Sequence, residues 1–162
     1  MVEFMEEQLI ERKETGITIL KKVGLLLLTL LVAYCIQFSS FVVYLLLIMI
    51  VVDVILFNRM KVEYEYVCFS GDFTIDKIFN KQSRKALLAT NMKEVEIVMP
   101  TNAPEMRAYE HLKALNYSSC EPYNKTFTMV TMHKGNKVRV IFEPNEKILK
   151  GLRAAAPRKV IY

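Results

Sequence analysis

The sequence predicts an α+β protein, in which an N-terminal transmembrane helical hairpin precedes a small antiparallel β-sheet or partly open barrel with a C-terminal helix. Three observations predict this fold. An apolar block of 35 residues covers positions 23–57. From Val62 onward, the apolar spacing changes from helical to the alternation of strands. Residues 143–153 then carry an amphipathic helical pattern. We therefore expect an N-terminal arm over 1–16, a hairpin over 17–59 and a β-rich domain over 60–162.

The apolar block is long enough to cross a bilayer twice. As one straight helix, its 35 residues would extend about 52 Å, whereas the hydrocarbon core of a bilayer is about 30 Å thick. The polar cluster Gln37–Ser40 favours a turn in the middle of the block. We therefore expect helices over 17–36 and 40–59, with one long tilted helix as the alternative.

The charges that flank the block predict its orientation. The 22 residues before the block carry four lysines and arginines, and the chain from Arg59 to its end carries 18 of them against 11 acidic residues. The turn between the two helices has no charge. Because positively charged flanks remain cytoplasmic, we expect a two-span protein of the cell membrane with both termini inside. The five glutamates of the first 16 residues are not typical of a signal peptide.

Asp53 is the only Asp, Glu, Lys or Arg of the apolar block, and a carboxylate in hydrocarbon is costly. A hairpin that pivots at 38–39 places Asp53 opposite residue 24, close to Lys21 and Lys22. We expect an ion pair between Asp53 and one of these two lysines, which would fix the hairpin. A solvated carboxylate at the interface and an ion pathway are the alternatives.

The N-terminal arm has helical apolar spacing at Met5 and Leu9. This pattern predicts a short interfacial helix over residues 3–14 that leads into the first membrane helix. A helix that binds a partner protein is the alternative.

The domain after the hairpin alternates strand patterns with turn residues. The first four predicted strands form a meander, Pro104 begins a predicted helix, and Lys134–Asn136 turns a predicted hairpin. The predicted strands are 62–69, 73–79, 84–89, 95–99, 126–132 and 137–142, and the predicted helices are 104–115 and 143–153. A terminal amphipathic helix across the open end of a curled sheet would cover its apolar face.

Three segments carry a resemblance to a known family: residues 7–13 before the hairpin, residues 64–85 with Gly71-Asp72-Phe73, and residues 142–160 with Phe142-Glu143-Pro144-Asn145-Glu146. They resemble an uncharacterised family of small bacterial two-helix membrane proteins with a pleckstrin-homology-like cytoplasmic domain. The resemblance covers nearly the whole chain. It implies a fold and a topology, but no catalytic activity.

No motif of an enzyme or a metal site is present. The chain has no phosphate-binding loop, dinucleotide fingerprint, zinc-protease motif or nucleophile elbow. Its three cysteines are not clustered, and its two histidines stand alone. We therefore expect no enzyme activity, no cofactor and no bound metal.

Two groups of basic residues could contact an anionic membrane surface, although the basic balance is also what cytoplasmic flanks of membrane proteins ordinarily show. The first group is Lys81, Arg84 and Lys85, and the second is Lys134, Lys137 and Arg139. We expect a non-catalytic scaffold or binding module, anchored in the bilayer, that contacts anionic headgroups or a membrane protein and no nucleic acid. An accessory subunit of a larger membrane complex is the alternative.

Overall fold

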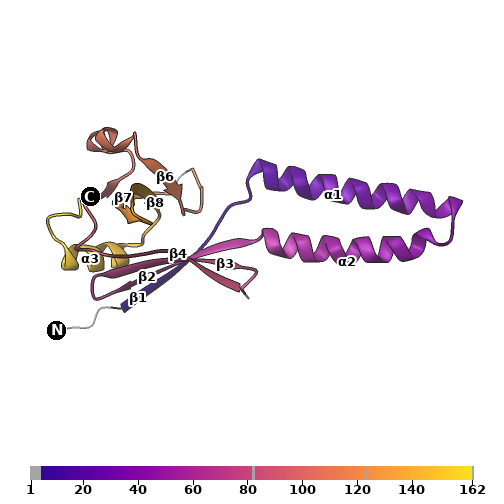
Figure 1. Ribbon diagram of the computed structural model, residues 1–162, viewed down its shortest axis with the longest axis horizontal. Helices are drawn as coiled ribbons and strands as arrows, with labels where there is room; N and C mark the ends of the chain where they lie inside the picture. Colours follow the sequence, from indigo (N-terminus) through magenta and orange to yellow (C-terminus); the bar gives the residue numbers. More distant parts are fainter. Residues whose placement is uncertain (1–4, 82, 123, 162) are drawn as a thin grey trace.

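The computed structural model describes residues 5–81, 83–122 and 124–161, except the side chains of Ile36 and Phe38. A pair of long helices projects from a β-rich domain (Figure 1). In chain order the elements are β1 (Met5–Glu11), α1 (Gly16–Tyr34), η1 (Cys35–Phe38), α2 (Val42–Met60), β2 (Val62–Phe69), β3 (Asp72–Phe79), β4 (Ser83–Asn91), β5 (Ile97–Pro100), η2 (Pro104–Tyr109), β6 (Lys113–Asn116), β7 (Phe127–His133), β8 (Asn136–Phe142) and α3 (Glu146–Ala155).

The two long helices confirm the predicted helical hairpin. Each has 19 residues, which gives a length of about 28 Å, close to the thickness of bilayer hydrocarbon. Both are long and apolar enough to cross a membrane, and this supports membrane association. Most of their leucine, isoleucine and valine side chains are exposed, and Asp53 is the single buried residue among those described in the two helices.

The prediction of a helix over residues 3–14 of the N-terminal arm is wrong for residues 5–14, the part that the structure describes. Met5–Glu11 is a strand that pairs antiparallel with β2, so that Ile10 lies opposite Tyr64. The segment also alternates, with Ile10 buried and Leu9 exposed. Pairing with the edge of β2 therefore outweighs the weak helical preference of its glutamates and Leu9.

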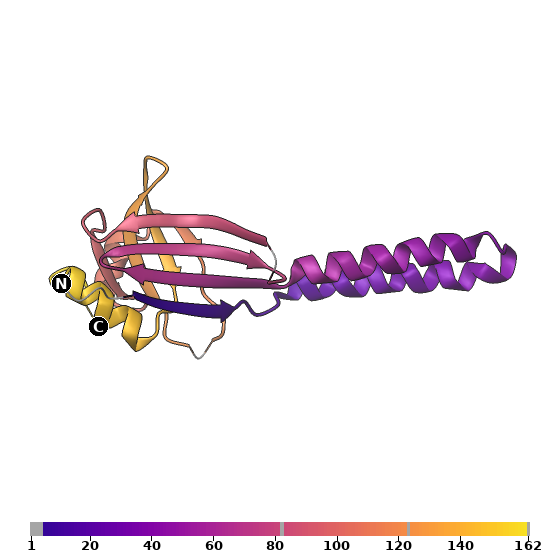
Figure 2. The ribbon, with the colours of Figure 1, turned by 90° about the horizontal axis from the view of Figure 1, so that it is seen from below.

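The first sheet has the order β1-β2-β3-β4, and all its pairs are antiparallel. Its strands run lengthwise in continuation of the helix pair (Figure 2). The predicted strands 62–69, 73–79 and 84–89 are confirmed as β2, β3 and β4. The predicted fourth strand of this meander belongs to the other sheet, because β5 pairs with β7.

The second sheet has the order β5-β7-β8-β6, and β6 lies parallel to β8. The predicted hairpin is confirmed as β7 and β8, whose turn has positive φ at Lys134 and Gly135. The helix predicted over 104–115 is wrong beyond its first part. One 3₁₀ segment, η2, buries Met106, and the chain then extends into β6, because the free edge of β8 offers it hydrogen-bond partners.

The two sheets form an open sandwich and do not close into a barrel. Buried Tyr66 and Phe73 of the first sheet pack on Phe142 of the second, with ring centroids 6.0 and 5.3 Å from Phe142. The predicted C-terminal helix is confirmed as α3, which buries Ile148 and Leu152 against this core. The Gln8 side chain of β1 also binds the backbone just before α3: it accepts a hydrogen bond from the Asn145 N–H (2.7 Å) and donates one to the Glu143 carbonyl (3.0 Å).

Candidate functional site

Asp53 lies between the two long helices, and its partner is Thr29. The Thr29 hydroxyl donates to Asp53 Oδ2 at 2.6 Å, and Asp53 is 9% exposed. The predicted ion pair is not formed among the described residues, since Lys22 pairs with Glu14 and lies 5.9 Å from the centroid of Phe57. Asp53 faces Thr29, five residues further along α1 than the predicted position 24, and therefore lies further from Lys21 and Lys22.

The six predicted basic contacts divide between two places. Lys81, Arg84 and Lys85 belong to the β3–β4 hairpin, whose turn lies beside the helix pair, and the other three belong to the β7–β8 hairpin, which projects away from the helices (Figure 2). They therefore do not form one patch.

Three of these six side chains already have partners. Arg84 forms a two-pronged ion pair with the buried carboxylate of Glu65, at 2.8 and 3.0 Å. Lys137 pairs with Glu96, and Arg139 Nε donates to the Leu112 carbonyl at 3.2 Å. Lys81, Lys85 and Lys134 make no hydrogen bond or ion pair through their side chains within the described ranges.

A cluster of cations lies on the inner face of the first sheet, at the end near the helices. Lys77 and Lys85 are directly opposite each other in β3 and β4, and Arg12 extends β1 on the same face. Arg12 Nη1 donates to the Tyr64 hydroxyl at 2.6 Å, and Lys77 Nζ lies 4.5 Å from the centroid of the Phe79 ring. We call Arg12, Lys77 and Lys85 the inner-face cations.

The inner-face cations repel one another. Burial lowers the pKa of Lys77, and the neighbouring charges of Arg12 and Lys85 lower it further. Within the described ranges no acidic side chain forms an ion pair with any of the three. The acidic residues of the adjacent strand, Glu63 and Glu65, alternate with Tyr64 and therefore lie on the opposite face.

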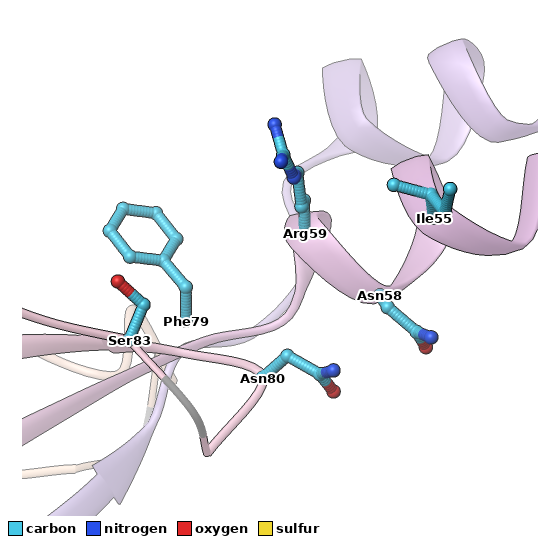
Figure 3. A pocket seen from close by; sticks show the side chains of 6 residues that line it. All are labelled: Ile55, Asn58, Arg59, Phe79, Asn80 and Ser83. Carbon is cyan, nitrogen blue, oxygen red and sulfur yellow. The ribbon is translucent and has the colours of Figure 1, made fainter. Parts of the chain in front are cut away.

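A groove lies between the end of α2 and Phe79, the residue whose ring contacts Lys77. It has a volume of about 570 Å³ and is lined by residues of α2, β3, β4 and the turn between those strands. In Figure 3 the side chains of Arg59, Phe79 and Ser83 extend to one side, and Asn58 and Asn80 extend to the other. The lining residues are Ile55, Asn58, Arg59, Phe79, Asn80 and Ser83. We call this hollow the junction groove.

The polar side chains of the junction groove have unused hydrogen-bonding capacity. Arg59, Asn58, Asn80 and Ser83 make no side-chain hydrogen bond or ion pair with other residues that the structure describes. Ile55 and Phe79 supply apolar walls. The groove can therefore accept a ligand that combines negatively charged oxygens with an apolar part.

The described part of the chain shows no group of three or more His, Cys, Asp or Glu residues that could hold a metal ion. The cysteines Cys35, Cys68 and Cys120 are free thiols. Burial raises the pKa of Cys68 to about 11, so this thiol stays protonated and unreactive at neutral pH.

Comparison with known families identifies the chain. The model of the family described as "Bacterial PH-like domain (DUF6106)" matches residues 2–162. The chain belongs to this family. The match confirms the resemblance to bacterial proteins with a pleckstrin-homology-like (PH-like) domain, and the predicted α+β fold agrees with it. PH-like domains are generally binding modules, not enzymes. No curated protein matches the chain, and no solved structure matches it.

Sequence reasoning missed three cations of the candidate site in this PH-like protein. It treated Arg12 and Arg59 as flanking charges that set the membrane orientation and Lys77 as part of a strand. One feature of the sequence could have indicated Lys77. Residues 73, 75 and 77 lie on the same face of β3, and Phe73 and Ile75 face the core, where a lysine is unusual.

Proposed function

We propose that this protein is a membrane-anchored, non-catalytic binding module. Its hairpin spans the cell membrane twice, with both termini in the cytoplasm, and holds the PH-like domain at the inner surface. The observation that carries the proposal is the helix pair itself. Two 19-residue apolar helices, with almost no buried residue, project from a folded domain. Tethering then raises the local concentration of the domain at its target without any new contact.

The ends of the helix pair support this placement. Near the turn, Tyr34, Phe41 and Tyr44 are 68, 82 and 68% exposed, as expected for aromatic side chains at a membrane–water interface. At the other end, Lys22 and Arg59 lie at the last turns before the domain. The positive charges of the helix pair therefore lie at the end next to the domain, and this favours a cytoplasmic position of the domain.

The native thiols allow a direct test of this topology. In intact spheroplasts and in inverted membrane vesicles, a membrane-impermeant maleimide is applied to two variants. Cys35→Ser keeps exposed Cys120 in the domain, and Cys68 is buried and unreactive. The triple variant Cys35→Ser, Cys120→Ser, Ser40→Cys places the thiol at the exposed tip of the hairpin.

The proposal predicts that Cys120 reacts in inverted vesicles only and that the tip thiol reacts in spheroplasts only. Reaction of both thiols from the same side would contradict the two-span topology. Extraction of the full chain from membranes by carbonate or high salt would contradict membrane anchoring altogether.

A second function is favoured by one observation. Asp53 Oδ1 is buried and has no hydrogen-bond partner among the described residues. A polar group of a third helix could satisfy it, which would make the chain an accessory subunit of a larger membrane complex. Cross-linking of native membranes followed by purification tests this function. A partner that is lost in Asp53→Leu and kept in the neutral control Val54→Leu supports the subunit; a partner kept in both variants opposes it.

A further inference from the structure

We propose that the junction groove binds the headgroup phosphate of one anionic phospholipid, with Arg59, Lys77 and Lys85 as its positive ligands. This inference rests on the proposed membrane anchoring and adds the chemistry of the ligand. The site belongs neither to the helix pair nor to the PH-like domain alone, because α2 and the β3–β4 hairpin both contribute its walls.

The level of the groove along the helix pair favours a lipid. Arg59 is in the last turn of α2, and Ile55 lies one turn before it, about 6 Å further into the bilayer. A phosphate beside Arg59 therefore allows the acyl chains of the same molecule to run along Ile55 and the outward-facing side chains of α2. A soluble anion would gain nothing from Ile55 or Phe79.

The charge around the groove favours a negative headgroup over a zwitterionic one. Phe79 and Ser83 line the groove, and Lys77 and Lys85 form the next pair on the same face of β3 and β4, directly beyond that lining. Their mutual repulsion lowers the pKa of Lys77 further than burial does alone. An anion placed between Lys77 and Lys85 removes this repulsion, whereas a choline or ethanolamine headgroup would bring a further positive charge.

A second hollow, which shares Asn80 with the junction groove, is a poorer anion site. This hollow of about 450 Å³ contains Arg12, Lys13, Lys61 and Lys81, but also four glutamates. Two of these carboxylates, Glu14 and Glu121, form ion pairs with Lys22 and Lys13. The cations of that hollow are therefore largely balanced, while those of the junction groove are not.

Native mass spectrometry of the full chain in detergent tests the inference. The protein is mixed with phosphatidylglycerol and phosphatidylcholine that have the same acyl chains, and the occupancy of each lipid is measured. The test variant is Lys77→Gln with Lys85→Gln. The matched control is Lys93→Gln with Lys125→Gln, which removes the same charge from exposed loop positions. Arg59→Gln is a further single variant, chosen because this exposed side chain has no role in the core.

The wild type and the control should bind one phosphatidylglycerol roughly tenfold more tightly than phosphatidylcholine, and both test variants should lose most of this preference. Equal affinity of the wild type for the two lipids, or an unchanged preference in both test variants, would overturn the inference. Displacement of phosphatidylglycerol by millimolar inorganic phosphate would show a site for soluble anions and would equally overturn it.

Failure of the inference can be distinguished from failure of the proposed function. Flotation of the full chain with liposomes of pure phosphatidylcholine measures anchoring without any anionic lipid. If the chain floats and shows no preference for phosphatidylglycerol, only the lipid site is wrong. If the chain does not float, the membrane anchor is wrong as well.

Discussion

The two ends of the first sheet differ sharply, although the same strands form both. Away from the helices, β2 and β3 carry Tyr66 and Phe73, which are fully buried beneath Phe142 of the second sheet and beneath α3. Near the helices, the same face of β3 carries Lys77 and Phe79, both half-buried, and the facing residue of β4 is exposed Lys85. The second sheet covers the first end and leaves the second uncovered (Figure 1).

This difference separates stability from binding. An apolar face must be covered, and the far end meets this requirement with aromatic side chains from both sheets. The near end is only partly covered by the residues that the structure describes, and its face is cationic where it meets the two long helices. Unpaired charges of the same sign that lie close together are expected at a site whose ligand has the opposite charge, because binding removes their repulsion.

The largest expected effect is on the covered end. Phe142→Ala should lower the free energy of unfolding by about 3–5 kcal/mol, because a fully buried ring is replaced by a cavity. Phe79→Ala, the matched change at the uncovered end, should cost less than about 1.5 kcal/mol. Denaturant unfolding of the full chain in detergent, followed by circular dichroism, measures both values, and similar losses would remove the contrast between the two ends.

A smaller difference should separate two tyrosines of β2. The Tyr66 hydroxyl donates to the Tyr117 carbonyl at 2.6 Å and accepts from the Glu143 N–H at 3.3 Å. Tyr66→Phe leaves both groups without this partner and should cost about 1–2 kcal/mol. Tyr64→Phe removes only the bond from Arg12, whose guanidinium is half-exposed, and should cost less. The same unfolding experiment checks this order, and a greater loss in Tyr64→Phe would reverse the comparison.

The smallest effect on stability, and one of opposite sign, is expected for Lys77. Its pKa is lowered in the folded state by burial and by the charges of Arg12 and Lys85, so its protonated form opposes folding. The unfolded chain binds more protons between the lowered pKa and the ordinary value of 10.5, and stability should therefore rise with pH in this window.

Lys77→Gln should accordingly raise the free energy of unfolding at pH 7 by less than about 1 kcal/mol and should weaken its rise with pH. Melting temperatures from pH 7 to pH 10 measure the effect, with Lys134→Gln as the control for an exposed turn lysine. A marked destabilisation by Lys77→Gln would show that this lysine supports the fold and would argue against a site kept for a ligand.

Much of the fold could be predicted because it is encoded by local patterns. The apolar block, the alternation of β2 and β3, and the turn at Gly135 each require only neighbouring residues. The errors arose where distant pairing decides the structure. Met5–Glu11 becomes a strand only because β2 offers its edge, and β6 forms only beside β8. Neither partner is visible from the segment itself.

The candidate site was less predictable, since it depends on which charges find partners. Arg84 was predicted as a membrane contact, but the buried carboxylate of Glu65 holds its guanidinium. Arg12 and Lys77 are 65 residues apart in sequence and meet only through the register of β1, β2 and β3. The position of Asp53 opposite Thr29 likewise depends on how the two long helices pack together.

The central claim is that the uncovered end of the first sheet lies at the membrane surface. Fluorophores attached at Ser83→Cys, near the helices, or at Lys134→Cys, in the β7–β8 turn, can be compared in the Cys35→Ser, Cys120→Ser background. The chains are reconstituted in nanodiscs that contain lipids with a spin label on the headgroup, which quenches nearby fluorophores. We predict strong quenching at position 83 and almost none at position 134. Equal quenching at the two positions, or stronger quenching at 134, would contradict the claim.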